Sequence, residues 1–366
     1  KNARRFLRPR KVRGGSLLFL NKRSRIFRTP FGVIGIIAPW NYPLGIPMHE
    51  IVPALLAGNA VIFKTAPETQ MVGRKIEEMI RLAGLPADVF IHLNLPGAII
   101  GQILLEPDLH VDKLFFTGSV PVGKTLMAKA AETLTPVSLE LGGNDPMLVC
   151  PDANLERAVN GAMWAGLQNS GQSCGGVERV YVHREVYEPF IRLLKRRVAT
   201  LRQGPNTHHD VDIGAMCTER QIATIQRQVA DALAKGATVL ARVEIDPAHA
   251  RANFYPVTVL TDVDHSMDLM REETFGPVLG VMKVDDMEQA VALANDSSLG
   301  LTGSVWSGDT RQAVALGRRI HAGVITVNDH LLTHGMAETP WGGVKESGIG
   351  RSHGELGFDE MTQPQV

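Results

Sequence analysis

The chain has 366 residues, and its 38 basic side chains are balanced by 38 acidic ones. This balance argues against nucleic acid and against a membrane surface as partners. Hydrophobic residues make up 44% of the chain and charged residues 21%, which is typical of a globular α/β protein long enough for two domains. No apolar run reaches the roughly 18 residues that a membrane span needs.

The basic start and the cysteines bear on the compartment. Residues 1–13 lack the apolar core and cleavage site of a secretory signal, so we predict a solvated basic edge that leads into a strand-like run at 16–20. The three cysteines, Cys150, Cys174 and Cys217, are odd in number and widely separated, unlike a disulfide framework. These features predict a cytoplasmic protein.

The first third of the chain alternates short β-branched runs with helical patterns. Strands are predicted at 32–38, 60–64, 89–93 and 113–116. Helices are predicted at 68–83 and around 99–105. The apolar face of the first helix would consist of Ile76, Met79, Ile80 and Leu82. This alternation predicts parallel βαβ units with ligands at the carboxyl ends of the strands.

A second alternating series begins after Gly142-Gly143, where we expect the chain to leave the first domain. Its predicted helices are 154–166, 188–201, 220–234 and 287–294. Its predicted strands are 179–182, near 239, near 257, 278–284 and 323–327. The series predicts a second α/β domain with a mixed sheet.

Cys174 differs from the other two cysteines in its surroundings. It lies in Gly171-Gln172-Ser173-Cys174-Gly175-Gly176, where glycines let the backbone bend and leave the sulfur approachable. A single cysteine is more often a small buried hydrophobe, and the remaining motifs decide between that role and a nucleophile. Trp164, Leu167, Gln168, Ser173 and Gly175 are candidates to line a path to the sulfur.

Three loops follow strands of the first domain, where a nucleotide would bind. They are Pro39-Trp40-Asn41-Tyr42-Pro43, Lys64-Thr65-Ala66-Pro67-Glu68, and the glycine-bearing turn 116–124 that opens a helix and could hold a phosphate. Gly118-x-x-x-x-Gly123-Lys124-Thr125 formally satisfies the P-loop pattern, but no Asp partner for magnesium stands out. Nucleotide hydrolysis is therefore a less favoured function for this segment than nucleotide binding.

Glu140 lies between leucines at the end of a strand-like run. A carboxylate is costly to bury there unless it is hydrogen-bonded, neutral or functional. A raised pKa is what a general base needs, while the alternative is a surface glutamate on an edge strand.

Seven motifs together resemble the aldehyde dehydrogenase superfamily in their order and separations. They are PWNYP at 39–43, GNAVIFK at 58–64, FTGS at 116–119, LELGG at 139–143, GQSC at 171–174, EETFGPV at 272–278 and PWGGVKESGIGR at 340–351. The resemblance implies an α/β fold with a Rossmann-like cofactor-binding domain, a second α/β catalytic domain and a small β oligomerisation arm. It implies segments at 11–28 (arm), 31–142 (NAD(P)-binding), 143–342 (catalytic) and 343–366 (C-terminal return).

The resemblance also implies an NAD(P)-dependent oxidation of an aldehyde to a carboxylic acid. Cys174 would add to the aldehyde to give a thiohemiacetal, and hydride transfer to NAD or NADP would leave a thioester on Cys174. Asn41 and the Cys174 N–H would stabilise the oxyanion, and Glu140 would activate the hydrolytic water. The implied cofactor contacts are Trp40, Lys64, Gly118, Ser119, Glu273 and Phe275. The implied partners are a small aldehyde and, in the complete protein, further copies of the chain in a dimer or tetramer.

Four features depart from the family pattern. Pro67 stands where a ribose-binding glutamate is common, which leaves NADP open as well as NAD, and Ser352 replaces a glutamate that follows Gly-Arg. Asn144-Asp145 replaces the commoner pair after LELGG. The chain is also shorter than family members. We expect it to lack an N-terminal part of the cofactor domain and a C-terminal strand, which would leave the arm unpaired.

Three alternatives remain at this point. A CoA-acylating enzyme would resolve the thioester with a thiol, which needs no water-activating Glu140. A binding protein or inactive fragment could retain the fold without the reaction. A cysteine hydrolase would need a histidine to activate Cys174, and none of the twelve histidines lies near it in sequence.

Overall fold

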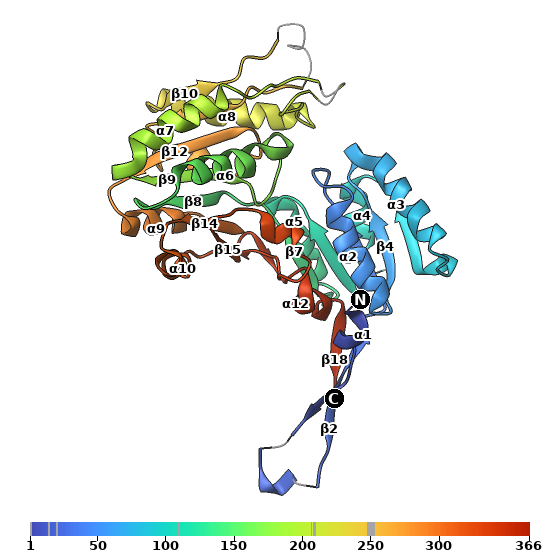
Figure 1. The fold of residues 1–366 in the computed structure, drawn as a ribbon. Coiled ribbons are helices and arrows are strands. Elements are labelled where there is room, and N and C mark those ends of the chain that lie inside the picture. The colour runs from blue at the N-terminus through green and yellow to red at the C-terminus, as the bar shows by residue number, and fades with distance from the viewer. Residues whose placement is uncertain are drawn as a thin grey trace. The chain divides into compact units, whose positions relative to one another are not determined.

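The structure, a computed structural model, divides the chain into two compact units (Figure 1). It describes residues 2–13, 15–19, 21–108, 110–205, 207, 210–246 and 253–366, with Ala98 described by its backbone alone. Unit 1 comprises Lys1–Glu140, Met336–Gly342 and Ile349–Val366, and unit 2 comprises Leu141–Gly335 and Gly343–Gly348.

Unit 1 is built on a six-stranded sheet in the order β17-β7-β6-β3-β4-β5. The bounds are β3 (Val33–Ile37), β4 (Ala60–Lys64), β5 (Phe90–Leu93), β6 (Lys113–Thr117), β7 (Val137–Glu140) and the short β17 (Gly348–Ile349). Strands β3 to β7 pair in parallel, and all four strands predicted in this region are confirmed. The loops that begin at Ala38, Thr65 and Gly118 therefore leave the same edge of the sheet.

Helices α2 to α5 connect the parallel strands in the way that their pairing requires, and α1 and α12 lie outside these connections. The bounds are α1 (Ala3–Phe6), α2 (Gly45–Leu56), α3 (Gln70–Leu82), α4 (Gly97–Ile103), α5 (Val120–Ala130) and α12 (Gly354–Asp359). The predicted apolar face of α3 is half right. Ile76 and Ile80, one turn apart, are buried, whereas Met79 and Leu82 are 48% and 75% exposed because they project from another side of the helix.

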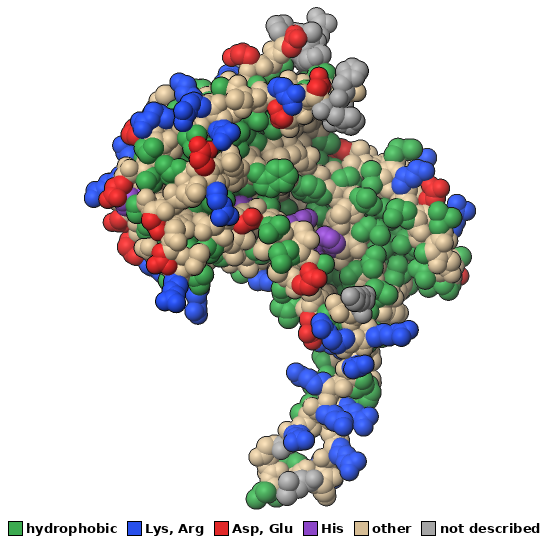
Figure 2. All heavy atoms as spheres, in the orientation of Figure 1, with side chains coloured by type: hydrophobic (Ala, Val, Ile, Leu, Met, Phe, Trp, Pro, Cys, Tyr) green, Lys and Arg blue, Asp and Glu red, His purple; other side chains and the backbone are tan. Residues whose placement is uncertain are grey.

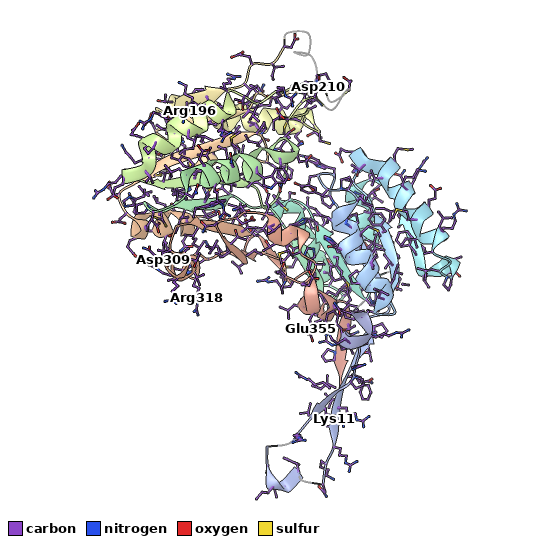
Figure 3. The ribbon with its side chains drawn as sticks, viewed as in Figure 1. Lys11, Arg196, Asp210, Asp309, Arg318 and Glu355 are labelled. Atoms are coloured by element: carbon purple, nitrogen blue, oxygen red, sulfur yellow. The ribbon has the colours of Figure 1, made fainter. Side chains whose placement is uncertain are left out.

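The residues predicted to form an arm belong to a three-stranded sheet, β1 (Arg10–Val12), β2 (Ser24–Pro30) and β18 (Thr362–Gln365). The expected lack of a pairing partner is wrong for β2, because Phe27–Pro30 pairs antiparallel with β18. The strand predicted at 16–20 is also wrong. Leu17–Phe19 forms a 3-10 helix with exposed side chains, and Leu20 lies outside the described residues. Lys and Arg side chains are spread along this sheet (Figure 2), among them Lys11 on β1 (Figure 3).

Unit 2 is built on a seven-stranded mixed sheet in the order β10-β11-β12-β9-β8-β14-β15. The bounds are β8 (Asp145–Val149), β9 (Val177–His183), β10 (Thr238–Arg242), β11 (Thr258–Thr261), β12 (Val278–Val284), β14 (Thr302–Trp306) and β15 (Val324–Val327). Only β10 is antiparallel to its neighbour, so the predicted mixed sheet is confirmed for the described strands. Two short strands, β13 (Leu299–Gly300) and β16 (Val344–Lys345), pair with each other.

Helices cover both faces of this sheet. The bounds are α6 (Leu155–Leu167), α7 (Arg184–Val198), α8 (Glu219–Ala234), α9 (Met287–Asn295), α10 (Thr310–Gly317) and α11 (Leu332–Gly335). Helices α6 and α7 share one hydrophobic core, and α8, α9 and α10 share the other. Side-chain caps set where helices begin: Asn154 accepts from Arg157 N–H at 3.1 Å, and Asp309 (Figure 3) accepts from Arg311 N–H at 2.8 Å.

Candidate active site

Cys174 lies at the corner of a hydrogen-bonded turn in unit 2, because the Gly176 N–H donates to the Ser173 carbonyl at 3.0 Å. The chain reaches this turn through three consecutive left-handed residues, Asn169 (φ 50°), Ser170 (φ 58°) and Gly171 (φ 71°). Such conformations cost energy in non-glycine residues and cluster at functional sites. At Gly171 a side chain would also collide with the Gly276 carbonyl oxygen, 2.1 Å from the position of a Cβ.

The three cysteines occupy different environments. Cys150 is buried, and this burial, together with the charge of Asp152, raises the pKa of its thiol to about 12. Cys217 is exposed, and Cys174 is half-buried at its turn. A thiol like that of Cys150 stays protonated and inert. Its environment therefore separates it from Cys174.

The second glycine of the LELGG motif contacts the Cys174 turn. A Cβ at Gly143 would lie 2.3 Å from the Cys174 carbonyl oxygen, so only glycine fits. The Gly143 N–H donates to Glu273 Oε1 at 3.0 Å. A Cβ at Gly142 would lie 2.5 Å from Oε2 of the same carboxylate. Two glycines thus bring the Cys174 turn and Glu273 together around one stretch of backbone.

Glu178 on β9 is a buried residue that the sequence analysis missed. It accepts hydrogen bonds from Thr274 N–H at 2.9 Å, Phe275 N–H at 2.7 Å and Asn144 Nδ2 at 2.8 Å. Burial raises the pKa of Glu178 to about 7, although these donors oppose the shift. Glu178 therefore fixes the backbone of the segment that carries Glu273 and Phe275.

Glu273 itself is half-buried and has an altered pKa. Desolvation raises the pKa of Glu273 to about 8, and the negative charges of Glu178 and Asp145 add to the shift. The Gly143 N–H opposes it. Phe275 follows in a left-handed conformation with φ 50°.

The unusual Asn144-Asp145 pair has a structural explanation. Asn144 Nδ2 bridges Glu178 and the Glu272 carbonyl, at 2.8 and 3.1 Å. Asp145 accepts both the N–H and the hydroxyl of Thr302, each at 2.9 Å. Arg179, also buried, donates from Nε to the Asn144 carbonyl at 2.8 Å. Its other donors reach Tyr181 and the carbonyls at the end of α9.

Glu140 is the last residue of β7 in unit 1. Its Oε2 atom is buried and has no hydrogen-bond partner among the described residues. Gly342, with φ 148°, leaves the other oxygen uncovered by a side chain, since a Cβ there would lie 2.9 Å from Oε1. Desolvation raises the pKa of Glu140 well above its ordinary value; Glu50 and Glu360 add to this rise and Arg351 opposes it.

Glu50 on α2 is a second carboxylate at this edge of the sheet that sequence analysis did not select. It is buried, and its Oε2 has no hydrogen-bond partner within the described ranges. Burial raises the pKa of Glu50 to about 8, opposed by the Thr117 side chain. Thr117 is in register with Glu140 on neighbouring strands. Glu360 is engaged elsewhere, since Ser138 Oγ donates to it at 2.8 Å and Lys113 is its ion-pair partner.

A cavity of about 530 Å³ opens at the carboxyl edge of the same sheet. Lys64 and Ser119 line it, and Gly97 and Gly101 leave room that larger residues would fill. Its volume is in the usual range for a small-molecule or cofactor site. Burial lowers the pKa of Lys64, while Glu68 opposes this. The cavity fits a nucleotide, with Ser119 at the start of α5 where a phosphate would meet backbone N–H groups.

The remaining sequence-selected residues of unit 1 closely follow residues that line this cavity. Gly118 directly follows Thr117, and Trp40 and Asn41 follow Ala38 by two and three residues; Thr117 and Ala38 both line the cavity. Trp40 and Asn41 are half-buried. Pro67 begins a 3-10 helix over Pro67–Thr69 at the end of β4.

The P-loop interpretation of residues 118–125 is wrong. A P-loop holds its phosphate in a loop between its glycine and its lysine. Here α5 begins at Val120 and includes Gly123, Lys124 and Thr125. The Gly123 N–H donates to the Ser119 carbonyl at 3.0 Å and is not available to a ligand.

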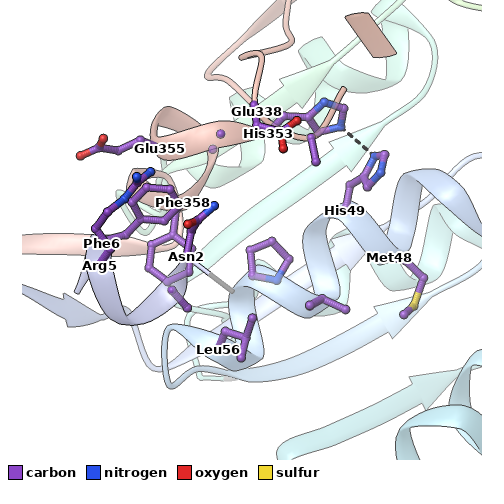
Figure 4. A pocket seen from close by; sticks show the side chains of 16 residues that line it. Asn2, Arg5, Phe6, Met48, His49, Leu56, Glu338, His353, Glu355 and Phe358 are labelled. Atoms are coloured by element: carbon purple, nitrogen blue, oxygen red, sulfur yellow. Dashed lines mark hydrogen bonds between the residues drawn. The ribbon is translucent and has the colours of Figure 1, made fainter. Parts of the chain in front are cut away.

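A second cavity, of about 480 Å³, is lined by parts of α1, α2 and α12 (Figure 4). His49 and His353 both line it and contact each other, with His353 Nε2 2.7 Å from His49 Nδ1. Burial lowers the pKa of His49. Its lining includes none of the residues that the sequence selected for cofactor or catalysis.

The candidate substrate-lining residues differ in exposure. Leu167 is buried in the hydrophobic core that α6 and α7 share. Trp164, one turn earlier, is 64% exposed. Within the described ranges, no cluster of three or more His, Cys, Asp or Glu side chains could hold a metal ion. None of the helices in that part of the chain is long and apolar enough to cross a membrane.

Comparison with known proteins decides the family. The model of the aldehyde dehydrogenase family matches residues 5–366. The chain belongs to the aldehyde dehydrogenase family. It therefore oxidises an aldehyde to a carboxylic acid with NAD or NADP, and the mixed α/β fold with parallel strands is that of aldehyde dehydrogenases.

Three relatives illustrate the similarity. A 4,4'-diapolycopene aldehyde oxidase of Methylomonas sp. is 40% identical over 371 residues, which cover 100% of this chain and 67% of the relative. The structure of an NAD-dependent aldehyde dehydrogenase from Sinorhizobium meliloti matches with a TM-score of 0.94 and 34% identity, over 100% of this chain and 71% of that one. That of a succinic semialdehyde dehydrogenase from Streptococcus pyogenes in complex with NADP+ matches with a TM-score of 0.92 and 27% identity, over 99% and 77%.

Proposed function

We propose that this aldehyde dehydrogenase uses Cys174 as nucleophile and Glu140 as the base that activates the hydrolytic water. The single observation that carries this assignment is the buried Glu140 Oε2, without a hydrogen-bond partner among the described residues, on a carboxylate whose pKa is raised. A base of this kind takes a proton from water readily. A CoA-acylating enzyme would have no use for it.

The reaction then follows from the chain's own groups. The Cys174 thiolate attacks the aldehyde carbon, and the Asn41 amide and the Cys174 N–H donate to the resulting oxyanion. NAD or NADP, when bound, would supply the acceptor for the hydride that leaves the former aldehyde carbon as its carbonyl re-forms. Glu140 removes a proton from water, the water oxygen attacks the thioester carbon, and the carbon–sulfur bond breaks to release the acid and the thiol.

We assign two groups of residues to the cofactor. Lys64 and Ser119 line the 530 Å³ cavity, so we assign them to the ribose and phosphate of the nucleotide, with Trp40 and Gly118 beside them. Glu273 and Phe275 are assigned to the nicotinamide end. The hydrogen bonds from Gly143, Thr274 and Phe275 support this assignment, because they fix that segment before any ligand binds.

For the substrate we propose an uncharged, apolar aldehyde. Residues 158–178 contain no Arg or Lys that could bind a substrate carboxylate. Arg179, which follows, is buried with its donors directed at protein acceptors. Trp164 offers an exposed aromatic surface ten residues before Cys174. The test compares turnover of a medium-chain aliphatic aldehyde, an aromatic aldehyde and succinate semialdehyde with each cofactor. Faster turnover of succinate semialdehyde would contradict this substrate class.

The proposal also covers the roles of the domains and the location of the protein in the cell. We assign cofactor binding to residues 31–142, catalysis to 143–342, the return segment to 343–366 and self-association to the arm at 11–28. The basic, exposed β1–β2 pair supports the arm's role. The three cysteines form no disulfide with one another, which supports a reducing, cytoplasmic location.

The direct test of the nucleophile is Cys174→Ala. We expect no measurable formation of reduced cofactor with any aldehyde and unchanged cofactor affinity by fluorescence titration. Cys217→Ala, which removes an exposed thiol instead, is the matched control and should keep its activity. Full turnover by Cys174→Ala would overturn the mechanism.

A further inference from the structure

His330 is a buried histidine of unit 2 without a role in the reaction described above. It lies three residues after β15 and is 4% exposed. Its Nδ1 is 2.8 Å from Ser304 Oγ, and its Nε2 is 3.0 Å from the Gly175 carbonyl oxygen. The same Nε2 is 3.0 Å from Thr302 Oγ1. Gly175 directly follows the nucleophile.

The neighbours of the ring determine where its proton lies. A carbonyl oxygen can only accept, so Nε2 must carry the hydrogen that binds Gly175. Ser304 Oγ accepts from Trp306 Nε1 at 3.0 Å and can donate its own hydrogen to Nδ1. Burial lowers the pKa of His330 to about 4, so the ring is neutral near pH 7. The ring is therefore an Nε2–H donor.

Thr302 cannot replace His330 as the donor to Gly175. Its hydroxyl donates to Asp145 Oδ2 at 2.9 Å and lies 3.4 Å from the Gly175 oxygen. A hydroxyl has one hydrogen, and the shorter bond to a buried carboxyl group takes it. Loss of the imidazole would leave the Gly175 carbonyl without its main donor.

The Gly175 carbonyl is one of several fixed points of the nucleophile turn. The turn is closed by the Gly176-to-Ser173 hydrogen bond of 3.0 Å, and the Cys174 carbonyl lies against Gly143. The Gly175 carbonyl and the Gly176 N–H belong to one peptide, so rotation of that peptide would break the Gly176-to-Ser173 hydrogen bond and open the turn that orients Cys174. His330 opposes this rotation by donating to the Gly175 carbonyl.

We propose that His330 is a positioning residue for Cys174: by holding the Gly175 carbonyl, it fixes the turn that directs the Cys174 N–H at the oxyanion. This inference rests on the proposed function, in which Cys174 is the nucleophile and its N–H stabilises the oxyanion. The consequence is specific. Reactions of Cys174 that form an oxyanion depend on His330, and reactions of the same sulfur that form none do not.

Two probes separate these reactions without any cofactor. With p-nitrophenyl acetate, the thiolate attacks the carbonyl carbon, a tetrahedral oxyanion forms, and the carbon–oxygen bond breaks to release nitrophenolate. With iodoacetamide, a carbon–sulfur bond forms as iodide leaves, and no oxyanion appears. Nitrophenolate release is followed by absorbance and alkylation by intact mass.

The two informative variants at position 330 differ in how far the side-chain amide extends. In His330→Gln the side-chain amide can extend to about the position of Nε2 and donate to Gly175. In His330→Asn it reaches only the Nδ1 position and faces Ser304. His265→Asn, which changes a histidine bound to Tyr181 and Asp296 at 2.8 and 2.7 Å, is the matched control.

We expect His330→Asn to slow nitrophenolate release about 10- to 100-fold, because small misplacements of a donor have effects of this size. Alkylation of Cys174 should stay within about twofold of the parent, as a thiol reaction without an oxyanion should. His330→Gln should recover most of the ester rate, and His265→Asn should leave both rates unchanged.

Unchanged ester turnover in His330→Asn would overturn the inference. An equal loss of ester turnover and alkylation, or the same loss in His330→Gln, would also overturn it, because either result indicates general damage to the turn. Cys174→Ala is measured alongside. Ester turnover that persists in Cys174→Ala contradicts the proposed function itself. If Cys174→Ala loses ester turnover and His330→Asn retains the parent's rate, only the role of His330 is contradicted.

Discussion

Glu140 and Glu178 are both glutamates with pKa values raised by removal from water, yet their surroundings differ. Glu178 in unit 2 receives hydrogen bonds from Thr274, Phe275 and Asn144. Glu140 in unit 1 has a buried oxygen without a partner among the described residues. A raised pKa alone therefore does not distinguish a base from a structural carboxylate. The hydrogen-bond donors that hold Glu178 separate it from Glu140.

The immediate neighbours repeat the contrast. Glu178 has Arg179 nearby, whose charge lowers its pKa. Glu140 has Glu50 as a neighbour, and this like charge raises its pKa by more than the charge of Arg351 lowers it. Buried carboxylates with several donors stabilise a fold, whereas a carboxylate with few donors is free to exchange a proton.

The largest expected effect is on the reaction in Glu140→Gln. Loss of the base should lower steady-state turnover about 10²- to 10⁴-fold, since general-base catalysis contributes that much. The midpoint of urea unfolding should not fall, because a neutral amide is easier to bury than a poorly solvated carboxylate. Reduced-cofactor formation and urea denaturation measure the two effects. A large loss of stability would place Glu140 with the structural carboxylates.

Glu178→Ala should show the opposite balance. It removes the acceptor of the Thr274 and Phe275 N–H groups and one of the acceptors of Asn144 Nδ2, and we expect a loss of about 3–5 kcal/mol in the free energy of unfolding. Glu178→Gln is the matched control, since its amide oxygen can still accept from the backbone. Urea denaturation of both variants tests this. Equal stability of Glu178→Ala and the parent would contradict it.

Glu50→Gln should shift the pH profile of the reaction. Activity requires ionised Glu140, so the rate rises with pH through its pKa. Removal of the Glu50 charge lowers that pKa, and the rising limb of kcat against pH should move to lower pH. Glu360→Gln serves for comparison, with a smaller shift because Glu360 contributes less. A shift to higher pH, or none, would exclude Glu50 as a neighbour of the base.

The smallest expected effect is on how the free energy of unfolding changes with pH. The pKa of Glu178 is about 7 in the folded protein and 4.5 ordinarily, so folding favours its protonated form. The contribution of Glu178 to the free energy of unfolding is complete below pH 4.5. It is lost as pH rises through about 7, with a limiting slope of about 1.4 kcal/mol per pH unit. Glu178→Gln should reduce this slope by the share of one carboxyl group. An unchanged slope would contradict the raised pKa.

Much of this architecture can be predicted from the sequence, because parallel strands give compact apolar runs such as those at 60–64 and 278–284. Strands β8 and β14 were missed because each mixes polar and apolar residues, and their burial depends on neighbouring strands far away in the chain. The partner of β2 was missed for a similar reason: its pairing with β18 joins residues more than 300 positions apart.

The residues of the candidate site also divide into those that the sequence predicts and those that it does not. Cys174, Glu140 and Lys64 lie in motifs with unusual local sequence and can be selected without a structure. Glu178 and Arg179 cannot, because two consecutive charged residues in Val177-Glu178-Arg179-Val180 favour exposed positions, yet the structure buries both. His330 gives no local signal either, since its partners Ser304 and Gly175 come from other segments.

The most direct test of the contrast between the two carboxylates is the intact mass of Glu140→Gln and Glu178→Gln after mixing with an aldehyde and NAD or NADP. We predict that Glu140→Gln gains the mass of one acyl group, which Cys174→Ala abolishes, because the thioester forms and is not hydrolysed. Glu178→Gln should show no adduct at steady state. An adduct on Glu178→Gln, or full turnover without an adduct on Glu140→Gln, would contradict the assignment of Glu140 as the base.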